Sequence, residues 1–147
     1  GSIFYMLNHG LSTAALFLAA GYLVKRGGSR DIAAYGGVQK LAPVAASLFL
    51  FAGLATLSLP GLSSFISEFM VLAGTFSVHP AFAVIATLGI VLAALYILLM
   101  YQRTMTGPVT PEVERTFTDD LSGRERLAVK VQQLQDLAQQ ATLRHPF

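Results

Sequence analysis

The 147-residue sequence contains no cysteine and little charge of either sign. Without cysteine, disulfide bonds and thiolate metal sites are excluded. Asp, Glu, Lys and Arg make up 12% of the residues, about half of the roughly 25% that is usual in soluble domains. The net charge of +2 is too small and too scattered for nucleic-acid binding. Together with a mean hydropathy of +0.59, these deficits favour a membrane protein over a small soluble helical domain, which would need amphipathic stripes.

Long stretches of the chain have no charge at all. Residues 1–24 lack Asp, Glu, Lys and Arg, and residues 4–24 are long enough to cross a hydrocarbon core of about 30 Å. Residues 41–76 and 81–101 form two further apolar segments. Within the middle one, the dipeptide Pro60-Gly61 breaks the helical pattern.

The distribution of cations predicts the topology. Lys and Arg gather in the loop 25–40 and again after Arg103, so the positive-inside rule places both regions in the cytoplasm. Three crossings satisfy this rule, whereas two or four would separate the regions. The middle crossing is then a discontinuous helix, a feature that marks ion and substrate sites in transporters. We therefore expect an all-α membrane protein with about three crossings over residues 1–103.

Residues 104–147 are polar and predict a tail with a loop and an amphipathic helix. Ser122 and Glu125 form a capping box that would open this helix. Its apolar stripe comprises Leu127, Val131, Leu134, Ala138 and Ala141. This stripe covers two heptads, which is too short for a self-sufficient coiled coil. We therefore expect the stripe to lie on a membrane surface or on a partner.

Glu68 is the single Asp, Glu, Lys or Arg of residues 41–102. A carboxyl at membrane depth is costly and marks a functional site. Because its protonation responds to any neighbouring positive charge, we predict that Glu68 carries protons. The alternative is a static acid that pairs with a lysine during helix assembly. Four nearby residues support this site, namely Pro60, Gly61, Ser63 and Ser64. We expect them to break or cap the helix and, secondarily, to bind water.

A polar stripe on the first span comprises Tyr5, His9, Ser12 and Thr13, which follow helical spacing. The titration range of histidine suits a proton relay, and the two hydroxyls lie alongside His9. The alternative is that His9 is satisfied by a carbonyl or by a tyrosine. The remaining histidines lie in a loop and in the tail without neighbouring ligands, so we predict no metal site.

Three motifs resemble one known family. Residues 5–17 read YMLNHGLSTAALF, residues 29–37 read SRDIAAYGG, and residues 59–69 read LPGLSSFISEF. In this order and spacing they resemble the antiporter-like M-type subunits of bacterial proton-pumping NADH:quinone oxidoreductase (respiratory complex I), which are related to Mrp-type sodium/proton antiporters. The resemblance covers roughly residues 1–107 and corresponds to the C-terminal third of such a subunit, so we expect a fragment of a longer protein.

The resemblance implies a role for two residues. Glu68 stands at the ionisable position of the family's discontinuous helix, and His9 stands at the histidine of its central proton path. Thr13 occupies a position where L-type subunits carry lysine, which favours the M type. After about Arg126 the family continues into a final apolar span, whereas this chain reads VKVQQLQD over residues 129–136.

The function implied by the resemblance is proton translocation in the membrane arm of the complex, in a bacterial plasma membrane. The partners would be lipid and the other membrane subunits. NADH oxidation and the reduction of ubiquinone or menaquinone would occur elsewhere, so we expect no redox centre, catalytic site or cofactor in this chain. No lysine lies within a span, so a cationic partner for Glu68 would come from outside. The alternatives are a segment of an Mrp-type antiporter and a truncated membrane protein that acts in assembly or interaction.

Overall fold

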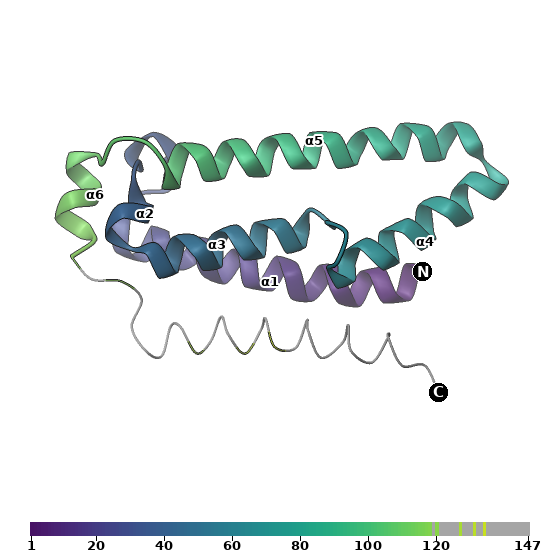
Figure 1. Cartoon of the computed structure of the whole chain (residues 1–147), viewed down its shortest axis with the longest axis horizontal. Helices are drawn as coiled ribbons and strands as arrows, with labels where there is room; N and C mark the ends of the chain where they lie inside the picture. The colour runs from purple at the N-terminus through teal and green to yellow at the C-terminus, as the bar shows by residue number, and fades with distance from the viewer. Residues whose placement is uncertain (119, 121–126, 128–130, 132–133, 135–147) are drawn as a thin grey trace.

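The computed structural model describes residues 1–118, 120, 127, 131 and 134, and every regular element among them is helical. This confirms the predicted all-α fold. Three rows of helix run along the long axis of the molecule: α1, then α3 followed by α4, then α5 (Figure 1). In chain order the elements are α1 (Ser2–Gly27), η1 (Ile32–Ala34), α2 (Val38–Leu41), α3 (Pro43–Thr56), α4 (Ser63–Val78), α5 (Pro80–Met105) and α6 (Pro111–Thr116).

Two of the helices are long and apolar enough to cross a membrane by length and composition. These are α1 and α5, each of 26 residues. Helix α3 has 14 residues and α4 has 16, so each rises only about 21–24 Å at about 1.5 Å per residue. Helix α5 leaves an apolar face exposed, a surface suited to lipid or to further protein. The large exposed side chains on this face include Val84, Ile85, Leu88, Val91, Leu92 and Leu95.

The connection between α3 and α4 covers residues 57–62 and contains the Pro60-Gly61 dipeptide. Two of its residues have left-handed backbone conformations, Ser58 with φ 54° and Gly61 with φ 102°. Glycine adopts positive φ at little cost, whereas serine does so uncommonly. The helical hydrogen-bond ladder is therefore interrupted here over six residues.

The core lies at the end of the molecule that holds α2 and α6 (Figure 1). Alanines on α1 and α3 allow these helices to approach closely, and the buried ones are Ala15, Ala19, Ala45, Ala46, Ala52 and Ala55. Two side chains from the polar tail, Val113 and Phe117, complete this core. The Phe117 ring packs edge-on against Tyr35 with the ring centroids 6.5 Å apart.

The connections that follow α1 and α5 meet at one end of the molecule, and the α4–α5 connection lies at the other (Figure 1). The backbone amide of Gly37 donates to the carbonyl of Thr106 at 3.0 Å. The hydroxyl of Thr110 donates to the carbonyl of Ala34 at 3.1 Å. The cation-bearing loop 25–40 therefore lies beside the start of the tail.

Three residues of the expected tail helix are described. They are helical and exposed, and they are Leu127, Val131 and Leu134. The other residues of the predicted capping box and stripe lie outside the described residues, namely Ser122, Glu125, Ala138 and Ala141.

Candidate functional site

Glu68 lies on α4, one helical turn after Ser64, and its side chain is half-buried. It makes no hydrogen bond and no ion pair with any other residue that the structure describes. Tyr5 of α1 is within electrostatic reach of the Glu68 carboxylate and of Tyr96 on α5. The carboxyl therefore lies on α4 near Tyr5 of α1, and it forms no ion pair with a cation in the described part of the chain.

Asn8 joins α1 to the first turns of α4, and its side chain is 1% exposed. Its Nδ2 donates to the carbonyl of Ser63 at 3.1 Å and to the Oγ of Ser67 at 3.2 Å. The Ser67 hydroxyl, fully buried, donates in turn to the carbonyl of Ser64 at 2.9 Å. The Asn8 Oδ1 is also buried, yet it accepts no hydrogen bond from the described residues. The amide is therefore oriented through its two N–H donors.

Ser64 joins α4 to α3 across the helix break. Its hydroxyl donates to the carbonyl of Ala55 at 2.8 Å, in the last turn of α3, and the same carbonyl accepts from the amide of Ser58 at 3.4 Å. Ser64 and Glu68 are four residues apart and share one face of α4. Glu68 is thus carried on a helix that is fastened to α3 and to α1 within one turn of the carboxyl.

The expected capping role of Ser63 and Ser64 is wrong. The N-cap residue of α4 is Leu62, and no side chain caps it. Both serines already belong to the helix and are buried. The Ser64 hydroxyl donates to α3, and the backbone carbonyl of Ser63 accepts from Asn8 of α1. Pro60 and Gly61 lie in the connection and are exposed.

The polar stripe of α1 divides between two faces. Ser12 is buried beside Asn8 and donates to the carbonyl of His9 at 3.3 Å. His9 is exposed, stacks on Tyr5 with ring centroids 5.7 Å apart, and places Nε2 3.5 Å from the Thr13 hydroxyl. Tyr5 therefore relates to both predicted proton carriers, as the ring that stacks on His9 and as the phenol within reach of Glu68.

Sequence reasoning missed Asn8 and Ser67. Both are uncharged polar residues in apolar helices, and each directly precedes a residue that was singled out, His9 or Glu68. A usable signal was the four-residue spacing of Asn8 and Ser12, which places two polar side chains on one face of an apolar helix.

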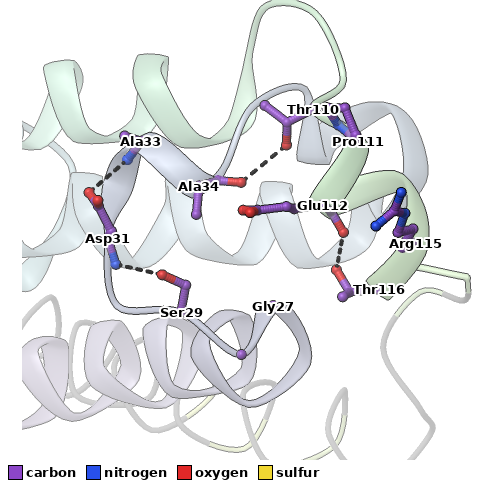
Figure 2. A pocket seen from close by; sticks show the side chains of 11 residues that line it. Gly27, Ser29, Asp31, Ala33, Ala34, Thr110, Pro111, Glu112, Arg115 and Thr116 are labelled. Atoms are coloured by element: carbon purple, nitrogen blue, oxygen red, sulfur yellow. Dashed lines mark hydrogen bonds between the residues drawn. The ribbon is translucent and has the colours of Figure 1, made fainter.

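An open hollow of about 950 Å³ lies away from Glu68, between the end of α1 and α6 (Figure 2). Its polar groups bind nearby backbone: Asp31 Oδ1 accepts from the amide of Ala33 at 3.0 Å, and Thr116 donates to the carbonyl of Glu112 at 2.8 Å. Among the described residues, no three His, Asp or Glu side chains gather into a group that could hold a metal ion. We therefore place the candidate site at Glu68.

Residues 1–95 match the sequence model of the family described as NADH:quinone oxidoreductase/Mrp antiporter, TM. The chain belongs to this family. It is 57% identical over 129 residues to NADH-quinone oxidoreductase subunit M of Mycobacterium tuberculosis. The aligned region covers 88% of this chain and 23% of that protein. Membership identifies the chain as part of a multi-pass membrane protein and confirms the predicted resemblance to antiporter-like M-type subunits.

Two further relatives of this antiporter-like family show how widely it is spread. NADH-ubiquinone oxidoreductase chain 4 of Arabidopsis thaliana is 44% identical over 85% of this chain and 25% of that protein. Subunit M of Rhodobacter capsulatus is 41% identical over 86% of this chain and 24% of that protein. The chain therefore spans about a quarter of the length of the curated relatives it matches.

Proposed function

We propose that the chain forms part of the proton-translocating membrane arm of an NADH:quinone oxidoreductase, with Glu68 as a carboxyl that gains and loses a proton. The relatives named as subunits of this oxidoreductase support the complex. The observation that carries the role is the isolation of Glu68, the single charged residue of 41–102, without a hydrogen-bond or ion-pair partner among the described residues. Such an acid responds directly to any charge that approaches it.

The chain crosses the membrane three times in this proposal. Helices α1 and α5 each cross alone, and α3 with α4 make one discontinuous crossing interrupted at residues 57–62. The lengths support this reading, because α3 and α4 are each too short for a core of about 30 Å. The loop 25–40 and the tail lie together on the cytoplasmic side, where their lysines and arginines favour them.

Proton transfer in this segment depends on Glu68 and, secondarily, on His9. NADH oxidation and quinone reduction take place in other subunits, and the coupling reaches Glu68 as a change in neighbouring charge. Tyr5, Ser12 and Thr13 supply hydroxyls along α1, and the chain itself carries no cofactor. The other membrane subunits of the complex and the lipid bilayer are its partners.

A segment of an Mrp-type sodium/proton antiporter is the second candidate, because the family description includes that group. The relatives reported above, at 41–57% identity, carry names of oxidoreductase subunits. Proton pumping that requires quinone reduction would favour the first candidate, and sodium exchange without electron transfer would favour the second.

The test is Glu68→Gln in the full-length subunit, assembled in its complex and reconstituted in vesicles. Glutamine keeps the shape and the hydrogen-bonding capacity but removes the titrating proton, so assembly survives while proton pumping fails. The matched control is Glu112→Gln, the same change at an exposed acid of α6, which pumps like the parent. If Glu68→Gln also pumps like the parent, Glu68 is a static acid.

A further inference from the structure

The first turns of α4 are not held in place by a continuous backbone helix. The six-residue interruption after α3 removes the hydrogen-bond ladder that would otherwise fix their rotation and height. Two side-chain attachments take over among the described residues. Ser64 bonds to α3, and Asn8 bonds from α1.

The Asn8 attachment fixes α4 from the side of α1. Its Nδ2 donates to two acceptors, the backbone carbonyl of Ser63 and the hydroxyl of Ser67. Both bonds meet at this one nitrogen, so they hold α4 at one point. The Ser64 hydroxyl holds α4 at a second point, on α3, and attachments to two different helices restrain both rotation and axial position. Glu68 directly follows Ser67, about 100° further round the helix, so any rotation of α4 moves its carboxyl.

The chemistry of the side chain explains why an amide stands here. The two donors of Asn8 are both used, whereas its buried Oδ1 accepts nothing from the described residues. The attachment therefore needs N–H groups in particular. Leucine has nearly the same outline and has none.

We infer that Asn8 is a positioning residue for Glu68: its hydrogen bonds to the Ser63 carbonyl and the Ser67 hydroxyl, together with the Ser64 bond to α3, hold α4 in the rotation that sets the surroundings of the carboxyl, and hence the pH at which it titrates. This inference deepens the proposed function and rests on it. Asn8 itself transfers no proton in this scheme.

The experiment measures the titration of Glu68 directly, in the assembled complex that carries the full-length subunit. Dicyclohexylcarbodiimide reacts with protonated carboxyl groups in apolar surroundings, and mass spectrometry of the peptide that contains Glu68 reports the modified fraction across a pH series. The variants are Asn8→Leu, Ser67→Ala and the double variant. Glu68→Gln gives the background, and Thr75→Ala is the matched control, because that hydroxyl bonds within α4 to the carbonyl of Val71.

Asn8→Leu is expected to shift the midpoint of modification by about one pH unit, and Ser67→Ala by less. The double variant is expected to match Asn8→Leu, because two residues that act through one contact are not additive. Thr75→Ala keeps the parental midpoint. Assembly is followed separately by the amount of complex recovered.

A parental midpoint in assembled Asn8→Leu overturns the inference, and so does strict additivity in the double variant. If Asn8→Leu does not assemble, Ser67→Ala is the deciding variant. A parental midpoint of Glu68 modification in Ser67→Ala then also overturns the inference. A parent in which Glu68 stays unmodified at every pH has no titration for Asn8 to set, which equally overturns it. Failure of the proposed function gives a different result from failure of this inference. In that case Glu68→Gln pumps protons like the parent, while the midpoint of Glu68 modification still shifts in Asn8→Leu.

Discussion

The carboxylate of Asp120 caps the N-terminus of α3 at Val44, 76 residues earlier in the chain. Its Oδ2 accepts from the amide of Val44 at 2.8 Å, and its Oδ1 accepts from the amide of Ala45 at 3.2 Å. The local N-cap residue is Ala42, whose side chain cannot cap. Arg26 of α1 donates to the backbone carbonyl of Asp120 at 2.9 Å. The tail is thereby fastened to both α1 and α3.

We expect Asp120→Ala to lower the free energy of unfolding by about 1–2 kcal/mol, because it leaves two helix-terminal amides without a partner. Asp120→Asn keeps one acceptor oxygen and should lose less. The measurement is thermal or denaturant unfolding of the purified full-length subunit. Glu114→Ala, a change at an exposed acid of α6, serves as the control. An equal loss in Glu114→Ala would attribute the effect to net charge instead of capping.

Tyr35 makes the stability of the core depend on pH in the alkaline range. Its buried hydroxyl donates to the carbonyls of Ser29, at 2.6 Å, and Leu23, at 3.1 Å, and burial raises the pKa of the Tyr35 phenol above 10.0. Because the folded pKa exceeds the unfolded one, this stabilisation is complete below about pH 10 and is lost as the pH rises through the folded pKa.

Tyr35→Phe should therefore be less stable than the parent at neutral pH, by about 1 kcal/mol, and should lack the alkaline decline that belongs to this phenol. The thermal midpoints of both proteins, measured from neutral pH to about pH 11, should converge at the alkaline end. Curves that stay parallel throughout would show that Tyr35 does not contribute to the pH dependence.

The substitution series at Glu68 separates a titrating role from a structural one. Glu68→Asp keeps the acid but withdraws it by one methylene, so we expect partial proton pumping. Glu68→Lys should retain some activity, because lysine is also titratable and its charge still couples to neighbouring charges. A structural role predicts the opposite order of pumping activity: Glu68→Gln would be tolerated and Glu68→Lys would abolish function. A lone cation in the bilayer centre costs about 3 kcal/mol on insertion scales.

His9→Ala should lower proton pumping less than Glu68→Gln does. His9 is exposed and stacked on Tyr5, and a water molecule can replace a relay group more readily than it can replace a charge. Met6→Ala, at an exposed position of the same helix, is the control for altered packing. A larger loss in His9→Ala than in Glu68→Gln, at normal assembly, would reverse the ranking of the two residues.

Single cysteines can test the proposed topology, because this segment has no native thiol. Gly36 is unsuitable, since a Cβ there would lie 3.0 Å from the carbonyl of Pro108. Gln39 on α2 and Val78 at the end of α4 are both exposed. Helix α2 and the α4–α5 connection lie at opposite ends of the molecule (Figure 1). Gln39→Cys should react with a membrane-impermeant thiol reagent from the cytoplasmic side, and Val78→Cys from the other side. Labelling of both from the same side would mean that α3 and α4 cross separately.

The sequence by itself determined the helical class, the two long apolar helices, the break after α3 and the isolation of Glu68. These are local properties: they depend on the length of an apolar run, on the helix-breaking chemistry of Pro60-Gly61 and on the absence of any Asp, Glu, Lys or Arg other than Glu68 over residues 41–102. The family motifs are equally readable, since they need only residue order and spacing.

The tertiary structure alone decided which polar groups meet. Asn8 bonds to residues 55 and 59 positions away, and Asp120 caps a helix that begins far earlier in the chain. The serines after the break face α1 and α3 instead of capping α4, and Ser12 turns inward while His9 turns outward. Helical spacing places these residues on faces, but it does not say which face another helix will cover. A buried hydrogen bond requires two distant groups to be brought together by packing, and that packing is a property of the whole fold.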